Sequence, residues 1–95
     1  MSEMSLKEQI HCMREMRSYL GDFCVMMKNV METFQNDINF LKSQGFSVET
    51  EETYRKNYYT PANNDVEQVI SDINQKHFDY IDRVIERLER AAGQE

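Results

Sequence analysis

The fold of this protein is decided by the stretch LKEQIHCMREMRSYLGDFCVMMKNVMETFQNDINFL, which runs from Leu6 to Leu41. Apolar side chains recur along it in alternating steps of four and three residues, a heptad pattern that only Arg17 interrupts. A period near 3.5 residues predicts one long helix, roughly 55 Å in length, with these side chains on one face. This seam consists of Leu6, Ile10, Met13, Leu20, Cys24, Met27, Met31, Phe34, Ile38 and Leu41.

A second apolar stripe with helical spacing follows in the C-terminal half of the chain. Pro61 interrupts it, because proline lacks the backbone N–H of a helix interior. Pro61 therefore either kinks one continuous helix or begins a main helix after a short one, and the unbroken stripe favours the kinked continuous helix. The stripe consists of Tyr54, Tyr58, Ala62, Val66, Ile70, Ile73, His77, Ile81, Val84 and Leu88.

The residues between the two patterns predict a tight turn. Gly45 suits the left-handed position after a helix, and Phe46 would then face Leu41 in a Schellman motif. Ser47 or Thr50 can cap the next helix. The expected boundaries are about 5–43 for the first helix, 44–49 for the turn and about 50–91 for the second helix.

These elements predict an all-α fold with a single domain, a long antiparallel two-helix hairpin. A chain of 95 residues buries a modest share of its surface, so the hairpin is expected to pair into a four-helix bundle. The methionines of the first helix suit an ordinary core and also a surface that adapts to the helices of another protein. Arg17 either extends from the seam past its apolar neighbours or meets an acid on the partner.

Composition narrows the classes of function. The chain has 17 acidic and 11 basic residues and a net charge of −6, which disfavours binding to nucleic acid or to an anionic membrane. No stretch approaches the 18 apolar residues of a membrane-spanning helix. Residues 1–5 lack the features of a cleaved signal peptide, so we expect synthesis in the cytoplasm and, for an exported chain, a route without a cleaved leader.

The sequence carries none of the common catalytic or metal-binding motifs, and it predicts a protein without enzymatic activity or cofactor. Glu8 and His11 have the spacing of di-iron carboxylate bundles, but such sites need a second pair and further acids. Cys24 lies on the seam, where a thiol acts as a small hydrophobe. Cys12 lies twelve residues away on the same predicted helix, too far for a disulfide within the chain.

Phe78 and Asp82 occur late in the second predicted helix. Because they are four residues apart, their side chains share one face, one turn apart. An aromatic anchor beside an acid can dock into a pocket that carries the opposite charge.

With these features the sequence resembles the Trp-X-Gly (WXG) superfamily of small acidic helical hairpins exported by bacterial type VII secretion. In that superfamily an aromatic residue, three further residues and an acid form an export signal late in the second helix. The small partner proteins of LXG toxins are similar, with Phe as the aromatic, as Phe78 and Asp82 are here. This chain has no Trp, and its turn, Ser43-Gln44-Gly45, keeps only the glycine of the turn motif, which favours the toxin-partner branch.

The resemblance implies a targeting protein that binds the helical N-terminal region of a secreted toxin. Phe78 and Asp82 would then lie exposed, to be recognised by a secretion ATPase. The alternative is a homodimeric helical bundle with a structural or regulatory role, in which a second copy covers the seam. Under both hypotheses the partner interface comprises Leu6, Ile10, Met13, Leu20, Met27, Met31, Phe34, Ile38, Leu41, Val66, Ile70, Ile73, His77 and Ile81.

Overall fold

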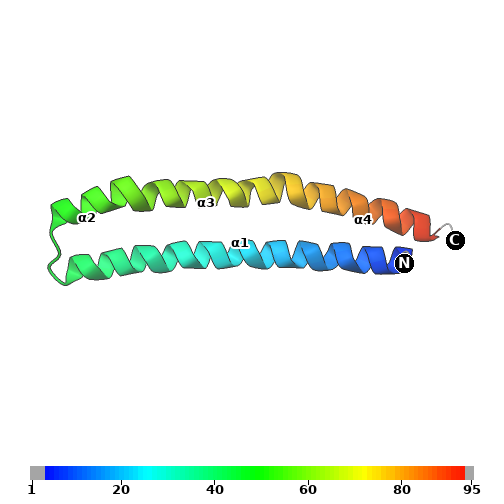
Figure 1. Ribbon diagram of the computed structural model, residues 1–95, viewed down its shortest axis with the longest axis horizontal. Coiled ribbons are helices and arrows are strands. Elements are labelled where there is room, and N and C mark those ends of the chain that lie inside the picture. The colour runs from blue at the N-terminus through cyan, green and yellow to red at the C-terminus, as the bar shows by residue number, and fades with distance from the viewer. Residues whose placement is uncertain (1–3, 94–95) are drawn as a thin grey trace. The chain divides into compact units, whose positions relative to one another are not determined.

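The computed structural model describes residues 4–93, which form an all-α helical hairpin (Figure 1). Helix α1 spans Leu6–Ser43 and is followed by a short turn. A second helical run then comprises α2 (Val48–Tyr54), η1 (Arg55–Tyr59), α3 (Thr60–Asp72), η2 (Ile73–His77) and α4 (Phe78–Gly93), in which η1 and η2 are π-helical turns. The predicted fold class is therefore confirmed.

The chain divides into two compact units. Of the described residues, unit 1 contains those up to Phe23 and those from Ser71 onward, and unit 2 is Cys24–Ile70. Within each unit, a stretch of α1 lies beside a stretch of the second helical run, which travels in the opposite direction (Figure 1).

The turn after α1 has the predicted Schellman geometry. Gly45 has a φ of 92°, a conformation that glycine adopts without the steric cost of a Cβ. The Phe46 N–H donates to the Leu41 carbonyl and the Gly45 N–H donates to the Lys42 carbonyl, each at 3.2 Å. These bonds satisfy two carbonyl groups that the helix itself leaves without partners.

Side-chain caps fix where the helices begin. The Ser5 hydroxyl accepts a hydrogen bond from the Glu8 N–H at 3.1 Å, one turn into α1. At the second helical run, the Ser47 hydroxyl accepts from the Thr50 N–H at 3.4 Å. Of the two candidate caps, Ser47 is therefore the one used, and α2 begins at Val48 rather than near residue 50.

Pro61 lies within a backbone that stays helical from Val48 to Gly93. The turn η1 ends at Tyr59, two residues before Pro61, and the Thr60 N–H donates to the Arg55 carbonyl, five residues back. A proline ring clashes with the carbonyl of the turn before it, and a wider π-helical turn gives that carbonyl room. The helical run therefore passes the proline without a break.

The inner face of α1 follows the predicted seam. Ile10, Cys24, Met31 and Ile38 are buried. The other members are half-buried, apart from Leu41 at the end of the helix, which is 48 % exposed. In unit 2 the core cluster contains Met31, Ile38 and Tyr59, and it is flanked by Phe34, Ala62 and Val66.

The inner face of the second helical run differs from the predicted stripe at three positions. Tyr54, Tyr58 and His77 are exposed, whereas Tyr59 is buried and Phe78 half-buried. For Tyr58 and His77 the cause is the π-helical turn in which each lies, because a π turn holds more residues than an α turn and shifts the positions that point inward. Tyr54 precedes η1; it is 44 % exposed, and its ring stacks on that of Phe34 with the centroids 6.1 Å apart. The prediction that His77 lies on the inner face was therefore wrong, and Phe78 takes that place.

Candidate functional site

The residues of the predicted aromatic–acid pair meet Arg17 of α1 within unit 1. The Arg17 Nε donates to Asp82 Oδ1 at 2.8 Å, and Nη2 lies 3.4 Å from Oδ2. The guanidinium carbon lies 4.4 Å from the centroid of the Phe78 ring. One guanidinium thus forms a two-pronged ion pair with the acid and a cation–π contact with the aromatic.

The contacts within the Arg17–Phe78–Asp82 cluster explain why the three side chains come together. Phe78 and Asp82 are separated by one turn of α4 and share a face. The turn η2 ends at His77, so the extra residue that it contains rotates Phe78 toward α1. Ile81, between them in sequence, is only 2 % exposed and anchors this part of α4 in the core.

The Arg17–Asp82 pair is solvated rather than enclosed. The side chains are 44 % and 53 % exposed, respectively. The hydrogen bond to Asp82, with the Coulombic attraction of the same carboxylate, raises the pKa of the Arg17 guanidinium. Arginine is charged at all ordinary pH values, so the shift changes no protonation state and the cluster holds a permanent cation.

Arg17 is therefore explained by the chain itself. Neither alternative from the sequence describes it, because the acid that it meets lies on α4 of the same molecule. The expectation that Phe78 is exposed needs correction, because Phe78 is half-buried under the guanidinium. Asp82 is exposed as expected, and Arg17 forms an ion pair with it. A second pair in unit 1, between Arg14 and Glu89, also joins α1 to α4.

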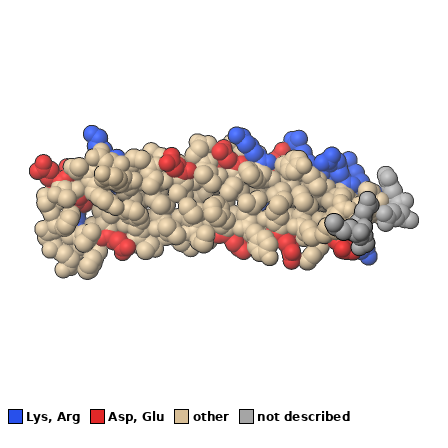
Figure 2. Space-filling model, in the orientation of Figure 1, with Lys and Arg blue, Asp and Glu red and all other residues tan. Residues whose placement is uncertain are grey.

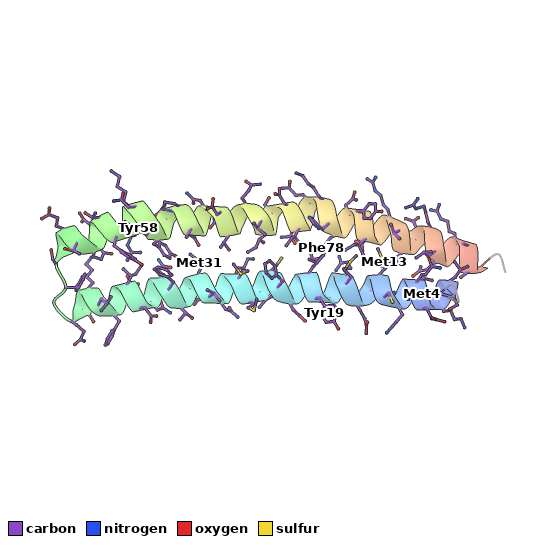
Figure 3. All side chains as sticks on the ribbon, in the orientation of Figure 1. Met4, Met13, Tyr19, Met31, Tyr58 and Phe78 are labelled. Carbon is purple, nitrogen blue, oxygen red and sulfur yellow. The ribbon has the colours of Figure 1, made fainter. Side chains whose placement is uncertain are left out.

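The two faces of α1 in unit 1 differ in what they present (Figure 3). Met13 and Phe78 point into the space between α1 and α4, where both are half-buried. Tyr19 lies on the outer side of α1 and is 67 % exposed. Met16, 42 % exposed, is also uncovered. Large apolar side chains therefore remain outside the intramolecular core.

A second feature lies in unit 2, where an open hollow of about 550 Å³ adjoins the turn. Its walls come from α1, the turn and α2, and they are mostly apolar. Several of these side chains are about half exposed, namely Val30, Leu41, Phe46 and Tyr54. Asp37 and Glu51 contribute the charges of the wall. The hollow is thus an apolar surface with an acidic edge.

Glu51 is a buried carboxylate, 5 % exposed, and it has a partner. Arg55 donates to it through Nε at 2.7 Å and reaches the Asn39 side-chain oxygen through Nη2 at 3.1 Å. The guanidinium also lies 5.6 Å from the ring centroid of Tyr59. Sequence reasoning missed this network, because the i, i+4 spacing of Glu51 and Arg55 signals only an ordinary helix pair.

Basic side chains gather over α4 on the face shown in Figure 2. Arg83 and Arg90 are among the most exposed of them, with side chains 74 % and 70 % exposed. Each is paired with an acid one turn earlier, Asp79 and Glu86, respectively. The charges of these two arginines are therefore locally neutralised, which weakens any attraction of this face for phosphates.

The residues considered for chemistry do not assemble into a reactive centre. His11 pairs with Glu15 at 3.2 Å rather than with Glu8. Cys24 is buried and Cys12 exposed, and both thiols are free. Among residues 4–93, no three His, Cys, Asp or Glu side chains are grouped so that they could hold a metal ion.

Comparison with known proteins adds no relative. No protein-family model matches the chain, and neither a curated protein nor a solved structure matches it significantly. Within the described residues, no helix has the length and apolar character needed to cross a membrane. The protein is thus an all-α helical hairpin with large apolar side chains exposed on both units.

Proposed function

We propose that this protein is a non-catalytic helical partner that binds the helical N-terminal region of a secreted toxin and helps to direct it to type VII secretion. The observation that carries the proposal is the apolar surface left uncovered on both units. Tyr19, Val25, Val30 and Phe40 of α1 are each more than half exposed. Exposed apolar surface of this extent favours association with further helices.

The Arg17–Phe78–Asp82 cluster supplies the targeting element in this proposal. Phe78 and Asp82 retain the spacing of the export signal in the superfamily that the sequence resembles. Arg17 contacts both side chains and holds them in one geometry. A secretion ATPase that recognises Phe78 and Asp82 would therefore bind a preorganised surface rather than two freely rotating side chains. The Arg17 guanidinium in the cluster is also a cation at a fixed position, which an acidic side chain of the secretion ATPase can approach.

The proposal is tested by co-expressing the chain with a toxin encoded beside it and measuring secretion and co-purification. Asp82→Asn and Phe78→Ala should stop export while the complex still co-purifies. The matched controls are Asp79→Asn and Tyr80→Ala, because Asp79 is also an ion-paired acid on α4 and Tyr80 is an exposed aromatic there. Export that persists in Asp82→Asn and Phe78→Ala would refute the targeting role.

Arg17→Ala separates a signal from a mere structural contact. This substitution removes the ion-pair partner of Asp82 and leaves Phe78 and Asp82 themselves unchanged in the sequence. If the secretion machinery reads Phe78 and Asp82 themselves, Arg17→Ala reduces export less than Asp82→Asn does. Equal losses in the two variants, with the complex intact, would show that the ion pair matters and the acid alone does not.

The same uncovered surface also supports a second candidate function, a homodimeric helical bundle with a structural or regulatory role. The two candidate functions are distinguished by measuring the solution mass of the chain alone and of the chain mixed with the toxin region. A homodimer that persists in the presence of the toxin region favours this second candidate. A dimer that exchanges for a mixed complex favours the partner role.

A further inference from the structure

We propose that the open hollow in unit 2 is a docking site for an amphipathic helix of another protein, whose apolar row is flanked by a Lys or Arg. The hollow, of about 550 Å³, exposes large apolar side chains toward solvent. Val30 is 51 % exposed, and Leu41 and Phe46 are each 48 % exposed. Covering these side chains with a partner's apolar face removes them from water, which is the main source of affinity in such interfaces.

The shape of the hollow selects a helix as the occupant. Its α1 wall extends from Val30 to Leu41, three turns of helix and about 16 Å. Its other wall, from Thr50 to Tyr54, is about one turn long. A small-molecule site encloses most of its ligand, whereas several large apolar side chains that line this hollow are about half exposed to solvent. An apolar hollow that follows one helix for three turns suits a further helix with apolar residues at i, i+3 or i+4, and i+7.

The charges that line the hollow indicate which charge the partner helix should carry. The lining contains Asp37 and Glu51, and none of its described residues is Lys or Arg. Arg55 already neutralises Glu51 at 2.7 Å. Asp37 is exposed, so it is the acid available to a cation on the partner. A second copy that docked hollow to hollow about a twofold axis would place Asp37 of both copies in the same interface, and like charges oppose that arrangement.

The biological setting of this inference rests on the proposed function. The inference adds the chemistry of the partner helix and the place in unit 2 where that helix binds. It does not depend on Phe78 or Asp82, which lie in unit 1. Loss of export on Asp82→Asn with no helix binding at the hollow would overturn this inference alone. Helix binding with export unaffected by Asp82→Asn would overturn the targeting role alone.

The experiment uses the full chain and a designed helical peptide of about 20 residues, with Leu at helical spacing and Lys beside the apolar row. Binding is followed by fluorescence anisotropy and by amide shifts of the labelled protein. A second peptide carries Glu in place of Lys. We expect the Lys peptide to bind, with the largest shifts at residues that line the hollow, and the Glu peptide to bind about tenfold more weakly.

Two pairs of variants make the result specific. Asp37→Lys should reverse the preference between the peptides, whereas Glu32→Lys, the same charge change on an exposed residue of α1 outside the hollow, should not. Val30→Gln should weaken binding severalfold, whereas Val69→Gln, at a position of α3 that is 46 % exposed and outside the hollow, should leave it unchanged. Circular dichroism confirms that each variant is folded.

Three outcomes would overturn the inference. One is no binding of the Lys peptide at millimolar concentration. Another is an equal effect of Glu32→Lys and Asp37→Lys, which would indicate general charge attraction. The third is a homodimer that Val30→Gln dissociates, because a second copy would then occupy the hollow.

Discussion

Arg17 of α1 and Asp82 of α4, 65 residues apart in sequence, are joined by a two-pronged ion pair with an Nε–Oδ1 distance of 2.8 Å. Because of this pair, the one residue that interrupts the heptad seam makes a contact between α1 and α4 in unit 1. It also determines what the aromatic–acid pair presents, because the same guanidinium lies over Phe78. A charged residue at a seam position favours a register in which its counter-ion is opposite.

The first prediction concerns the strength of that pair. Arg17→Ala and Asp82→Ala should each lower the melting temperature of the lone chain by a few degrees, and the double variant by no more than the larger single loss. Because the pair is exposed, the effect should shrink as salt rises from 0.05 to about 1 M. Additive losses in the double-variant cycle would show that the two side chains act independently.

The sequence predicted α1 and its inner face almost completely. A heptad pattern is a faithful guide wherever every turn is α-helical, and α1 is one uninterrupted α-helix from Leu6 to Ser43. The Schellman turn was also predictable, since Gly45 and Phe46 act on their immediate neighbours. These features depend on local chemistry that the sequence displays directly.

The inner face of the second helical run and the Arg17 cluster could not be predicted in the same way. A π-helical turn inserts a residue without a distinctive composition, and although Pro61 follows η1, no proline accompanies η2. The spacing of the stripe therefore predicts His77 on the inner face, where the structure has Phe78. The partner of Arg17 depends on how α1 and α4 align, which spacing along one helix does not reveal.

The second prediction tests the core beneath the cluster. Ile81 is 2 % exposed, so Ile81→Ala should reduce the free energy of unfolding by about 2–5 kcal/mol, measured by urea denaturation followed at 222 nm. Its control is Tyr80→Ala, at the neighbouring residue, which is 63 % exposed. That change should stay within about 0.5 kcal/mol. A loss of the same size in both variants would contradict the packing described for α4.

The third prediction uses two glycines that should respond in opposite directions. Gly45 has a φ of 92°, so Gly45→Ala should destabilise the protein by about 1 kcal/mol. Gly21 lies inside α1, where an added Cβ would meet no atom within 4 Å, so Gly21→Ala should stabilise it by up to about 1 kcal/mol. Thermal unfolding measures both. Destabilisation by Gly21→Ala would indicate that a close approach to Gly21 exists in solution.

The fourth prediction concerns the buried carboxylate of unit 2. Arg55→Met leaves Glu51, 5 % exposed, without its cation and should cost about 1–3 kcal/mol in unfolding free energy. The double variant Glu51→Leu with Arg55→Met removes both charges and should recover a large part of that loss. Chemical denaturation of the three proteins provides the comparison. A double variant less stable than Arg55→Met alone would show that Glu51 has further stabilising contacts.

The last prediction tests whether η2 rotates Phe78 inward. In the structure Ile73 and Phe78, five residues apart, are consecutive residues of the inner face. The Phe78 N–H donates to the Ile73 carbonyl, which is the hydrogen bond of a π-helical turn. Deletion of Gln75 shortens the spacing of Ile73 and Phe78 to four residues, which an ordinary α turn accommodates with both side chains still inward. The deletion variant should therefore keep its helicity and melt within a few degrees of the parent.

Deletion of Asp65, an exposed residue of α3, is the control. There every turn is already α-helical, so the loss of one residue rotates the flanking parts of the inner face by about 100° against each other. The Asp65 deletion should abolish cooperative unfolding, as circular dichroism during heating would show. If the Gln75 deletion were equally damaging, the wide turn would itself be required, and Phe78 would owe its position to α4 packing rather than to the extra residue in η2.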